Sequence, residues 1–212
     1  MTPPSPQRVY AIADAGALGG TPLAAAVGAM AGAGVRWIQV RAKRCSGRDF
    51  FQALEGSCRA VEGSGCVLWV DDRADLAALF PVAGVHVGQA DLPPSSARRV
   101  VGPEKWIGVS THDETQLAVA DADPEVDLVA VGPVFATTGK ADPDPVVGLP
   151  SVQRARARTA KPLVAIGGID AGNAAAVLAA GADAVAVLGA VCREPSLEGI
   201  AKACRRLLAA AG

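Results

Sequence analysis

Short apolar runs recur along the whole chain and alternate with stretches in which the apolar residues follow helical spacing. The apolar runs predict eight strands, at residues 9–13, 37–41, 67–71, 84–87, 106–109, 128–131, 163–166 and 184–187. The stretches between them predict eight helices, at residues 23–34, 50–62, 75–80, 95–101, 114–120, 150–159, 171–180 and 197–211. Gly34 is expected to cap the first helix. Strands that are apolar throughout are typical of parallel sheets, which are covered on both faces.

The regular alternation of strands and helices predicts the fold. It implies right-handed βαβ units and a parallel sheet. Eight such units in 212 residues predict a single-domain (β/α)8 TIM barrel over residues 9–212, preceded by a short N-terminal lead-in at residues 1–8. The alternative is a doubly wound open sheet, which usually carries a glycine-rich fingerprint after its first strand. Residues 13–16 read Ala-Asp-Ala-Gly, which is no such fingerprint.

Composition narrows the class of protein. Hydrophobic residues make up 50% of the chain. The net charge is −1, so the chain lacks the excess of basic residues that would indicate nucleic acid or an anionic membrane as a partner. No apolar run is long enough to span a bilayer, and the Pro-rich start lacks the pattern of a signal peptide. The five cysteines include no C-x-x-C pair, which predicts free thiols in a cytoplasmic protein. Cys45 lies near the expected site, and we interpret it as a small buried or incidental residue rather than a reactive thiol. The apolar barrel exterior leaves room for a homo-oligomer.

Two carboxylates are the first candidate group. Active residues of such barrels lie at the carboxyl ends of the strands, and the polar residues of this chain concentrate there. Asp72 and Asp91 follow neighbouring strands and, with phosphate oxygens and water, suit octahedral Mg²⁺. The alternative is structural, with Asp72 pairing with Arg73 or capping the next helix, and Asp91 capping a turn.

Three cations form the second group. Arg41, Lys43 and Lys140 would all lie on this same end of a nearly neutral protein, which predicts an anionic ligand. Arginine can hold a phosphate through two parallel hydrogen bonds, whereas lysine acts as a point charge. The alternative is that all three are ordinary surface cations. Arg41 argues against it, because it ends an apolar strand.

Glycines after the last two strands form the third group. In many barrels the loops after strands 7 and 8 bind phosphate through backbone N–H groups, and glycine permits close approach. Gly167, Gly168 and Gly189 stand at these places, although tight turns would use the same residues. Of the two histidines, His86 is expected to be packed and hydrogen-bonded, and His112 is a candidate for hydrogen bonding or proton transfer in the site.

Together these groups predict one metal site and two anion sites. That combination fits two phosphorylated small-molecule substrates, one of which carries a diphosphate leaving group. Metal and cations would stabilise the charge on the departing diphosphate. The sequence shows neither a Ser-His-Asp nucleophile elbow nor an HExxH metal motif.

Six segments in this order carry a resemblance to a known family. They are residues 39–43, 70–77, 84–92, 107–112, 132–140 and 165–169, which read QVRAK, VDDRADLA, GVHVGQADL, IGVSTH, GPVFATTGK and AIGGI. With them the chain resembles the thiamin phosphate synthase family from about residue 9 to the last helix. The resemblance implies a transferase that couples 4-amino-2-methyl-5-(diphosphomethyl)pyrimidine with thiazole phosphate, giving thiamin phosphate and diphosphate. It implies a dissociative reaction, in which diphosphate leaves before the thiazole nitrogen attacks.

The resemblance also implies roles for individual residues. Asp72 and Asp91 would hold Mg²⁺. The implied catalytic groups are Arg41, Lys43, Ser110 and Lys140. The implied substrate-binding residues are Gln39, Val40, Arg41, Ala42, Lys43, Asp71, Ser110, His112, Thr137, Thr138, Gly139, Lys140, Gly167, Gly168, Leu188 and Gly189.

The chain departs from the pattern of the family at three positions. Asp71 stands where the family usually has Asn, which adds negative charge beside the diphosphate. Gly139 replaces the second Thr of a Thr-x-Thr-Lys loop, and Thr138 is its expected substitute. Gly189 stands where the family often has Ser, and a backbone N–H would serve there.

Two other functions remain open from the sequence. A thiazole tautomerase, which resembles the synthase in fold, would use a histidine at the place of His112 and needs no metal. A non-catalytic protein that binds thiazole phosphate would keep the glycine site but has no need of Asp72, Asp91 and Lys140. Residues 136–147, rich in Pro, are the expected lid over the site.

Overall fold

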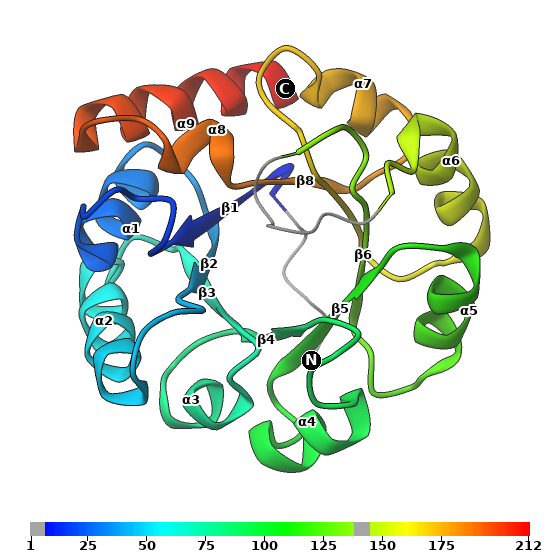
Figure 1. Cartoon of the computed structure of the whole chain (residues 1–212), viewed down its shortest axis with the longest axis horizontal. Helices are drawn as coiled ribbons and strands as arrows, with labels where there is room; N and C mark the ends of the chain where they lie inside the picture. The colour runs from blue at the N-terminus through cyan, green and yellow to red at the C-terminus, as the bar shows by residue number, and fades with distance from the viewer. Residues whose placement is uncertain (1–6, 138–144) are drawn as a thin grey trace.

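The structure, a computed structural model, describes residues 7–137 and 145–212. Eight parallel strands form a closed barrel in which each strand pairs with the next and β8 returns to β1 (Figure 1). They are β1 (Val9–Asp14), β2 (Trp37–Arg41), β3 (Val67–Asp71), β4 (Gly84–Val87), β5 (Trp106–Thr111), β6 (Leu128–Val131), β7 (Leu163–Ile166) and β8 (Ala184–Val187). The predicted barrel is confirmed and the open-sheet alternative is excluded. Only β1 and β5 extend beyond their predicted ends.

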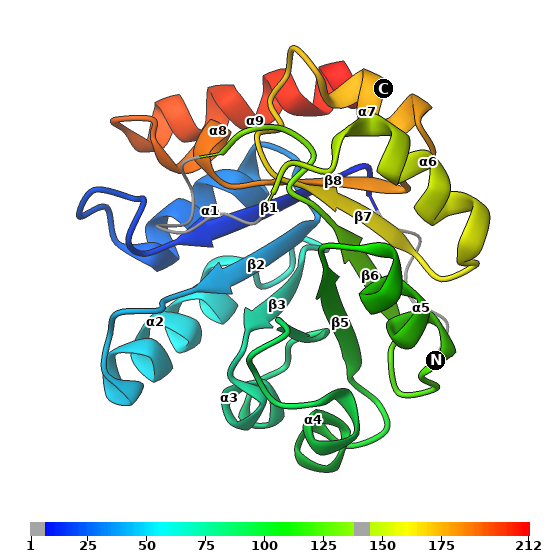
Figure 2. The same ribbon diagram turned by 45° about the vertical axis from the view of Figure 1, so that its right-hand side comes forward.

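Helices surround the barrel and pack on its outer face (Figures 1 and 2). They are α1 (Leu23–Gly32), α2 (Gly47–Ala60), α3 (Ala74–Leu79), α4 (Pro94–Val101), α5 (Glu114–Ala122), α6 (Gly148–Arg158), α7 (Ala174–Ala179), α8 (Gly189–Cys192) and α9 (Leu197–Ala211). The eight predicted helices are present with shifts at their ends. The short helix α8, directly after β8, is an addition to the prediction.

Local capping explains two of these shifts. The side chain of Ser46 accepts a hydrogen bond from the backbone N–H of Asp49 at 3.1 Å, so α2 begins at Gly47, earlier than predicted. Ala33, rather than Gly34, caps α1. Gly34 follows it with a φ of 106°, a left-handed conformation that glycine adopts without a steric penalty.

The core has two layers, one between barrel and helices and one inside the barrel. Large aromatic side chains fill the inner layer toward the amino ends of the strands. The ring centroids of Tyr10 and Trp37 lie 5.6 Å apart, and those of Trp69 and Trp106 lie 5.8 Å apart. All four side chains are buried, so they fill the barrel interior and close it at the amino ends of the strands. Chemistry is therefore confined to the carboxyl end.

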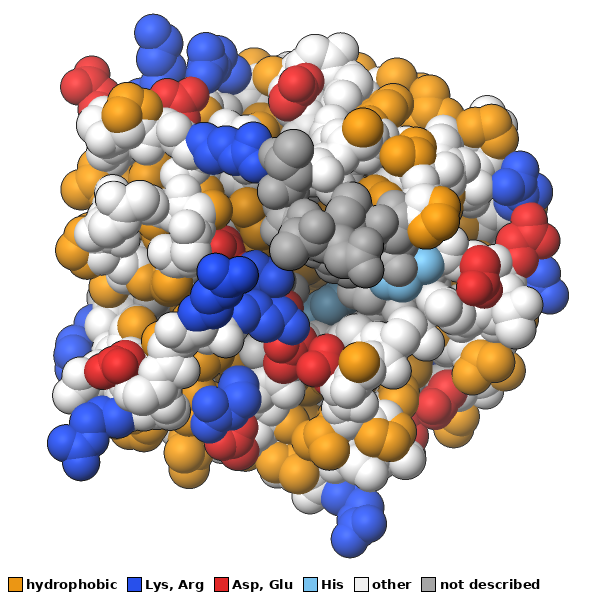
Figure 3. All heavy atoms as spheres, viewed as in Figure 1, with side chains coloured by type: hydrophobic (Ala, Val, Ile, Leu, Met, Phe, Trp, Pro, Cys, Tyr) orange, Lys and Arg blue, Asp and Glu red, His pale blue; other side chains and the backbone are white. Residues whose placement is uncertain are grey.

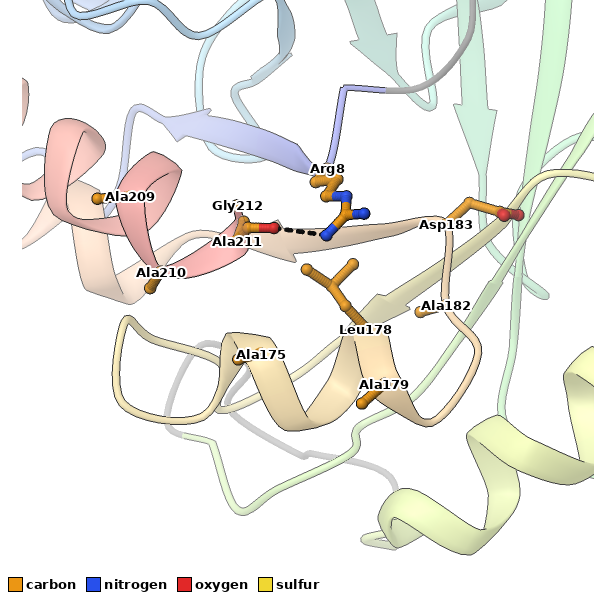
Figure 4. A pocket seen from close by; sticks show the side chains of 10 residues that line it. All are labelled: Arg8, Ala175, Leu178, Ala179, Ala182, Asp183, Ala209, Ala210, Ala211 and Gly212. Carbon is orange, nitrogen blue, oxygen red and sulfur yellow. Dashed lines mark hydrogen bonds between the residues drawn. The ribbon is translucent and has the colours of Figure 1, made fainter.

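The two ends of the described chain meet beneath β8. Arg8 donates from Nη1 to the carbonyl oxygen of Ala211 at 2.8 Å, which ties the start of β1 to the end of α9 (Figure 4). The shallow cavity beside this contact is lined mainly by alanines of α7 and α9. Its one carboxylate, Asp183, is already engaged by Arg156 and by the backbone N–H of Leu163. This cavity is part of the packing between helices. No helix within the described residues is long and apolar enough to cross a membrane.

Candidate active site

A pocket of about 890 Å³ lies at the carboxyl ends of the strands, and each of the eight strands contributes to its lining. Basic, acidic and histidine side chains gather around the centre of this face (Figure 3). The predicted site residues that line the pocket are Gln39, Arg41, Lys43, Asp71, Asp72, Asp91, Ser110, His112, Thr137, Gly167, Gly168, Leu188 and Gly189. The barrel therefore brings together most of the residues that the sequence singled out.

The remaining predicted residues divide into two kinds. The side chains of Val40 and Ala42 pack in the layer between barrel and helices, so only their backbone could serve a ligand. Outside the described residues lie Thr138, Gly139 and Lys140, together with most of the expected lid. Cys45 is exposed, is absent from the described lining, and its thiol lies 3.3 Å from the carbonyl oxygen of Ala42.

A row of alternating charges crosses one side of the pocket. Asp14 and Arg41 are partners in the register of β1 and β2, and the Arg41 guanidinium binds the carboxylate of Asp14. Its Nε lies 3.2 Å from Asp71 Oδ2. Lys43 Nζ lies 3.6 Å from the same oxygen and also binds the carboxylate of Asp72. Asp14 was missed by sequence reasoning, although its place at the end of the first strand was the available signal.

The carboxylates of this row are difficult to ionise together. The pKa of Asp71 is raised to about 7, because burial and the negative charge of Asp72 together outweigh the opposing effect of Lys43 and Arg41. Burial also raises the pKa of Asp72; Lys43 counteracts this, and a side-chain hydrogen bond with Asp91 adds to it. The Lys43 ammonium has a raised pKa because its interactions with these acids outweigh its burial. The site thus favours additional positive charge.

The donor set fits a divalent cation. Asp14, Asp71, Asp72 and Asp91 carry four negative charges against two positive charges on Arg41 and Lys43, which leaves an excess of two when all are ionised. Within the described part of the chain, no cluster of three or more His, Cys or acidic side chains could by itself hold a metal. A hard cation here would take further oxygen ligands from substrate and water, as Mg²⁺ commonly does.

Backbone conformation and hydrogen bonds position Asp72 and Asp91, the two carboxylates predicted to bind the metal. Asp72 has a φ of 59°, the left-handed region that asparagine and aspartate enter more readily than most residues. Its backbone N–H donates to the carbonyl oxygen of His86 at 2.8 Å. Asp91 Oδ2 accepts a hydrogen bond from the backbone N–H of Gly88 at 2.9 Å. The first bond ties the loop after β3 to strand β4, and the second fixes the Asp91 carboxylate within the loop after β4.

Both histidines line the pocket, in different environments. His86 is buried, its Nε2 lies 3.0 Å from Ser110 Oγ, and burial lowers its pKa to about 4. This confirms the prediction of a packed, hydrogen-bonded residue. His112 Nδ1 lies 2.6 Å from the carbonyl oxygen of Gly132, so Nδ1 carries the proton of that bond. Gln89, which the sequence reasoning left without a role, donates to the carbonyl oxygen of Ser110 at 2.7 Å.

The opposite side of the pocket is built from glycines. Gly167 and Gly168 have φ values of 103° and 64°, and a Cβ on Gly168 would lie 2.6 Å from the carbonyl oxygen of Ala136. Only glycine fits there without a backbone shift. The guanidinium of Arg193 lies close to Gly189, since a Cβ there would be 3.6 Å from Arg193 Cζ. Arg193 is a pocket cation that sequence reasoning missed, and its place four residues after Gly189 was the signal.

Comparison with known proteins identifies the family to which the chain belongs. The sequence profile of the thiamine monophosphate synthase family matches residues 9–191. The chain belongs to this family. It is 45% identical over 192 residues to the thiamine-phosphate synthase of Koribacter versatilis, covering 89% of this chain and 90% of that protein. It is 40% identical over 185 residues to the thiamine-phosphate synthase of Albidiferax ferrireducens, covering 87% and 84%.

A solved structure agrees with this membership of the thiamine monophosphate synthase family. The thiamine phosphate pyrophosphorylase of Pyrococcus furiosus superposes with a TM-score of 0.86 at 28% identity, covering 97% of this chain and 95% of that one. The resemblance carried by the six motifs is thereby confirmed, and with it the predicted role as an enzyme of thiamin phosphate synthesis.

Proposed function

We propose that this pocket couples the pyrimidine diphosphate with thiazole phosphate by Mg²⁺-assisted dissociative substitution. The observation that carries the proposal is the row of charges with its excess of two negative charges, which faces a glycine-built wall across one pocket. The row suits a metal with a polyanionic leaving group, and the wall suits a monophosphate. Two phosphorylated substrates would thus meet between them.

The chain's own residues have distinct tasks in this scheme. Asp72 and Asp91 would hold Mg²⁺, which when bound supplies positive charge to the diphosphate. Arg41 and Lys43, already oriented by carboxylates, would bind the diphosphate oxygens, with Lys140 as a further cation. The C–O bond to diphosphate breaks first, and diphosphate leaves with the electron pair.

The second half of the reaction needs a positioned nucleophile rather than a reactive side chain. The thiazole nitrogen attacks the pyrimidine methylene carbon, and the new C–N bond completes thiamin phosphate. Backbone N–H groups at Gly168 and Gly189 would bind the thiazole phosphate, helped by Thr137 and the guanidinium of Arg193.

The remaining properties follow from this assignment. We propose residues 9–212 as one catalytic domain, working in the cytoplasm on small phosphorylated substrates. Nucleic acid and membrane have no part in it, and a homo-oligomer remains open. At Asp71 the extra charge relative to the family's usual Asn is partly offset by Arg41 and Lys43, both within ion-pair distance, and a bound divalent cation would offset the rest. This position therefore stays compatible with diphosphate binding.

The test measures product and leaving group together. Purified protein would be mixed with both substrates, with and without Mg²⁺, and thiamin phosphate and diphosphate would be quantified. We expect equal amounts of both, dependent on Mg²⁺, and their loss in Asp72→Ala and Asp91→Ala. Asp75→Ala is the matched control, because Asp75 is an exposed carboxylate that pairs with Arg73 outside the pocket. Metal-independent isomerisation of thiazole phosphate without coupling would instead support the tautomerase and His112.

A further inference from the structure

His86 occupies a constrained place on the inner wall of the barrel. It lies in β4 beside Gly108 of β5, its register partner, and its side chain is buried. One ring nitrogen, Nε2, lies 3.0 Å from Ser110 Oγ, and both residues line the pocket. The sequence predicted a packed, hydrogen-bonded His86 but did not name its partner.

The other ring nitrogen has an unusual neighbour. Nδ1 is buried and has no hydrogen-bond partner among the described residues. It faces Gly108 so closely that a Cβ on that glycine would lie 2.4 Å from Nδ1. In glycine a hydrogen stands in the Cβ direction, so a Cα–H group points at Nδ1.

This geometry selects one tautomer of the ring. A proton on Nδ1, in the neutral or the charged imidazole, would point at the Cα hydrogen of Gly108 and would lack an acceptor. Buried N–H groups without an acceptor are rare, whereas an unprotonated nitrogen can receive a weak C–H contact. Nδ1 is therefore the unprotonated nitrogen, and Nε2–H donates to Ser110 Oγ.

We propose that His86 is a positioning residue that holds the Ser110 hydroxyl with its proton directed into the pocket. Because Ser110 Oγ accepts from Nε2–H, its own O–H must turn away from His86, and a second lone pair remains on Oγ. Gln89 fixes the same residue through its carbonyl oxygen. Ser110 thus presents a hydroxyl of defined direction to the pyrimidine diphosphate, an inference that rests on the proposed function of the pocket.

The tautomer can be measured without any substrate. The chain has two histidines, so protein labelled with ¹⁵N-histidine gives two sets of ring signals, and His112→Gln identifies those of His86. We expect His86 to show a protonated Nε2 and an unprotonated Nδ1 near neutral pH. A protonated Nδ1 would overturn the proposal, whether or not the coupling reaction is found.

The positioning role can be measured by kinetics. His86→Leu removes the N–H donor and should lower kcat/KM for the pyrimidine diphosphate about tenfold, the order expected for one lost hydrogen bond. The KM for thiazole phosphate should stay unchanged. His86→Gln, whose amide can donate from a similar position, should recover part of the loss. Equal losses for both substrates in both variants would indicate a merely structural residue.

A double mutant separates direct action from action through Ser110. If His86 works through that hydroxyl, His86→Leu should cost nothing more in a Ser110→Ala background. Losses that add would show that His86 acts elsewhere and would overturn the proposal. A wild-type protein that makes no thiamin phosphate would count against the proposed function instead, and the ring-nitrogen measurement would still decide the tautomer.

Discussion

The two ends of the barrel both carry charged side chains, but they use them differently. At the amino end Arg98 and Lys105 are satisfied by the loops that lead into the strands. Arg98 donates to the carbonyl oxygens of Gly102 and Glu125 at 3.1 Å and pairs with the carboxylates of Glu125 and Asp127 at 2.9 and 2.7 Å. Lys105 donates to Phe80 and Val82 carbonyl oxygens, at 2.8 and 2.9 Å.

At the carboxyl end negative side chains outnumber the positive side chains that they contact. Arg41 and Lys43 contact side-chain carboxylates, which outnumber them, and the pKa of Asp71 rises to about 7 as a result of burial and of the negative charge of Asp72. Cations that bind backbone carbonyls hold loops in place, because each bond gives a hydrogen-bond partner to a carbonyl group that would otherwise be buried without one. An unbalanced row of charges, in contrast, favours an incoming cation. Charge balance, more than the number of charges, distinguishes the functional end.

The largest expected effect comes from Asp72 at the carboxyl end. Asp72→Asn keeps a side chain that tolerates the φ of 59° and removes only the charge. We expect the coupling rate to fall about 1000-fold, which corresponds to about 4 kcal/mol of lost transition-state stabilisation. The measurement is thiamin phosphate formation at saturating substrates over a range of Mg²⁺.

Stability is the control for this substitution. Removing one member of an excess of negative charges should leave the thermal midpoint of the metal-free protein unchanged or slightly higher. A large fall in the midpoint would mean that Asp72 is mainly structural, and the contrast between the two ends would then fail.

Arg98 is the corresponding test at the amino end. Arg98→Met keeps the aliphatic stem and removes every donor of a guanidinium that is mostly buried. We expect the free energy of unfolding to fall by about 2 kcal/mol, because two carboxylates and three carbonyl groups lose a partner. Urea denaturation measures this change, and the rate per folded molecule should stay close to that of the wild type. A loss of rate without a loss of stability would reverse the assignment of the two ends.

The sequence predicted the architecture closely because barrel strands obey a simple pattern. Each strand is mostly apolar and is bounded by turn residues, so its limits could be read to within two residues. The prediction that polar residues concentrate at the carboxyl ends of the strands says nothing of the amino end. There Lys161 Nζ donates to the carbonyl oxygens of Ala120 and Asp123 at 2.9 and 2.6 Å. Such bonds to distant carbonyls leave no pattern in a sequence.

The site was predicted in membership but not in its internal contacts. Motif positions gave Arg41, Lys43 and Asp72, because Arg41 ends a strand and the other two follow within two residues of a strand end. The role of Asp14 depends on the lateral register of β1 and β2, which pairs it with Arg41. The tautomer of His86 depends on the approach of Gly108 from β5. Cross-strand relations of this kind require the closed barrel.

Asp14 offers a smaller and more specific test of the charge row. Its carboxylate binds Arg41 and also accepts a hydrogen bond from the backbone N–H of Ala17 at 2.8 Å. Asp14→Asn keeps the shape and one acceptor but loses the charge that orients the guanidinium. We expect the KM for the pyrimidine diphosphate to rise about tenfold, with kcat changed much less. Initial rates at varied concentrations of each substrate would show it, and an equal rise in the KM for thiazole phosphate would contradict it.

Asp71 gives the smallest expected effect and reports directly on the excess charge. Its pKa in the folded protein, about 7, lies above the ordinary value of 3.8 that applies when the chain is unfolded. Ionisation of Asp71 therefore costs stability: the penalty is absent below about pH 4, grows between the two values and is complete above about pH 7. Asp71→Asn removes that penalty. In the presence of a chelator its thermal midpoint at pH 8 should exceed that of the wild type by several degrees, and the gap should narrow toward pH 4.

Magnesium supplies the discriminating control for Asp71. A bound divalent cation would offset the negative charge that raises the Asp71 pKa, so adding Mg²⁺ at pH 8 should stabilise the wild type more than Asp71→Asn and reduce the gap between them. Thermal unfolding of both proteins with chelator and with Mg²⁺ measures this difference. If Asp71→Asn were less stable than the wild type at pH 8 without metal, the pairing of Asp71 with Arg41 and Lys43 would outweigh its burial. The carboxyl end would then be a balanced network, like the amino end.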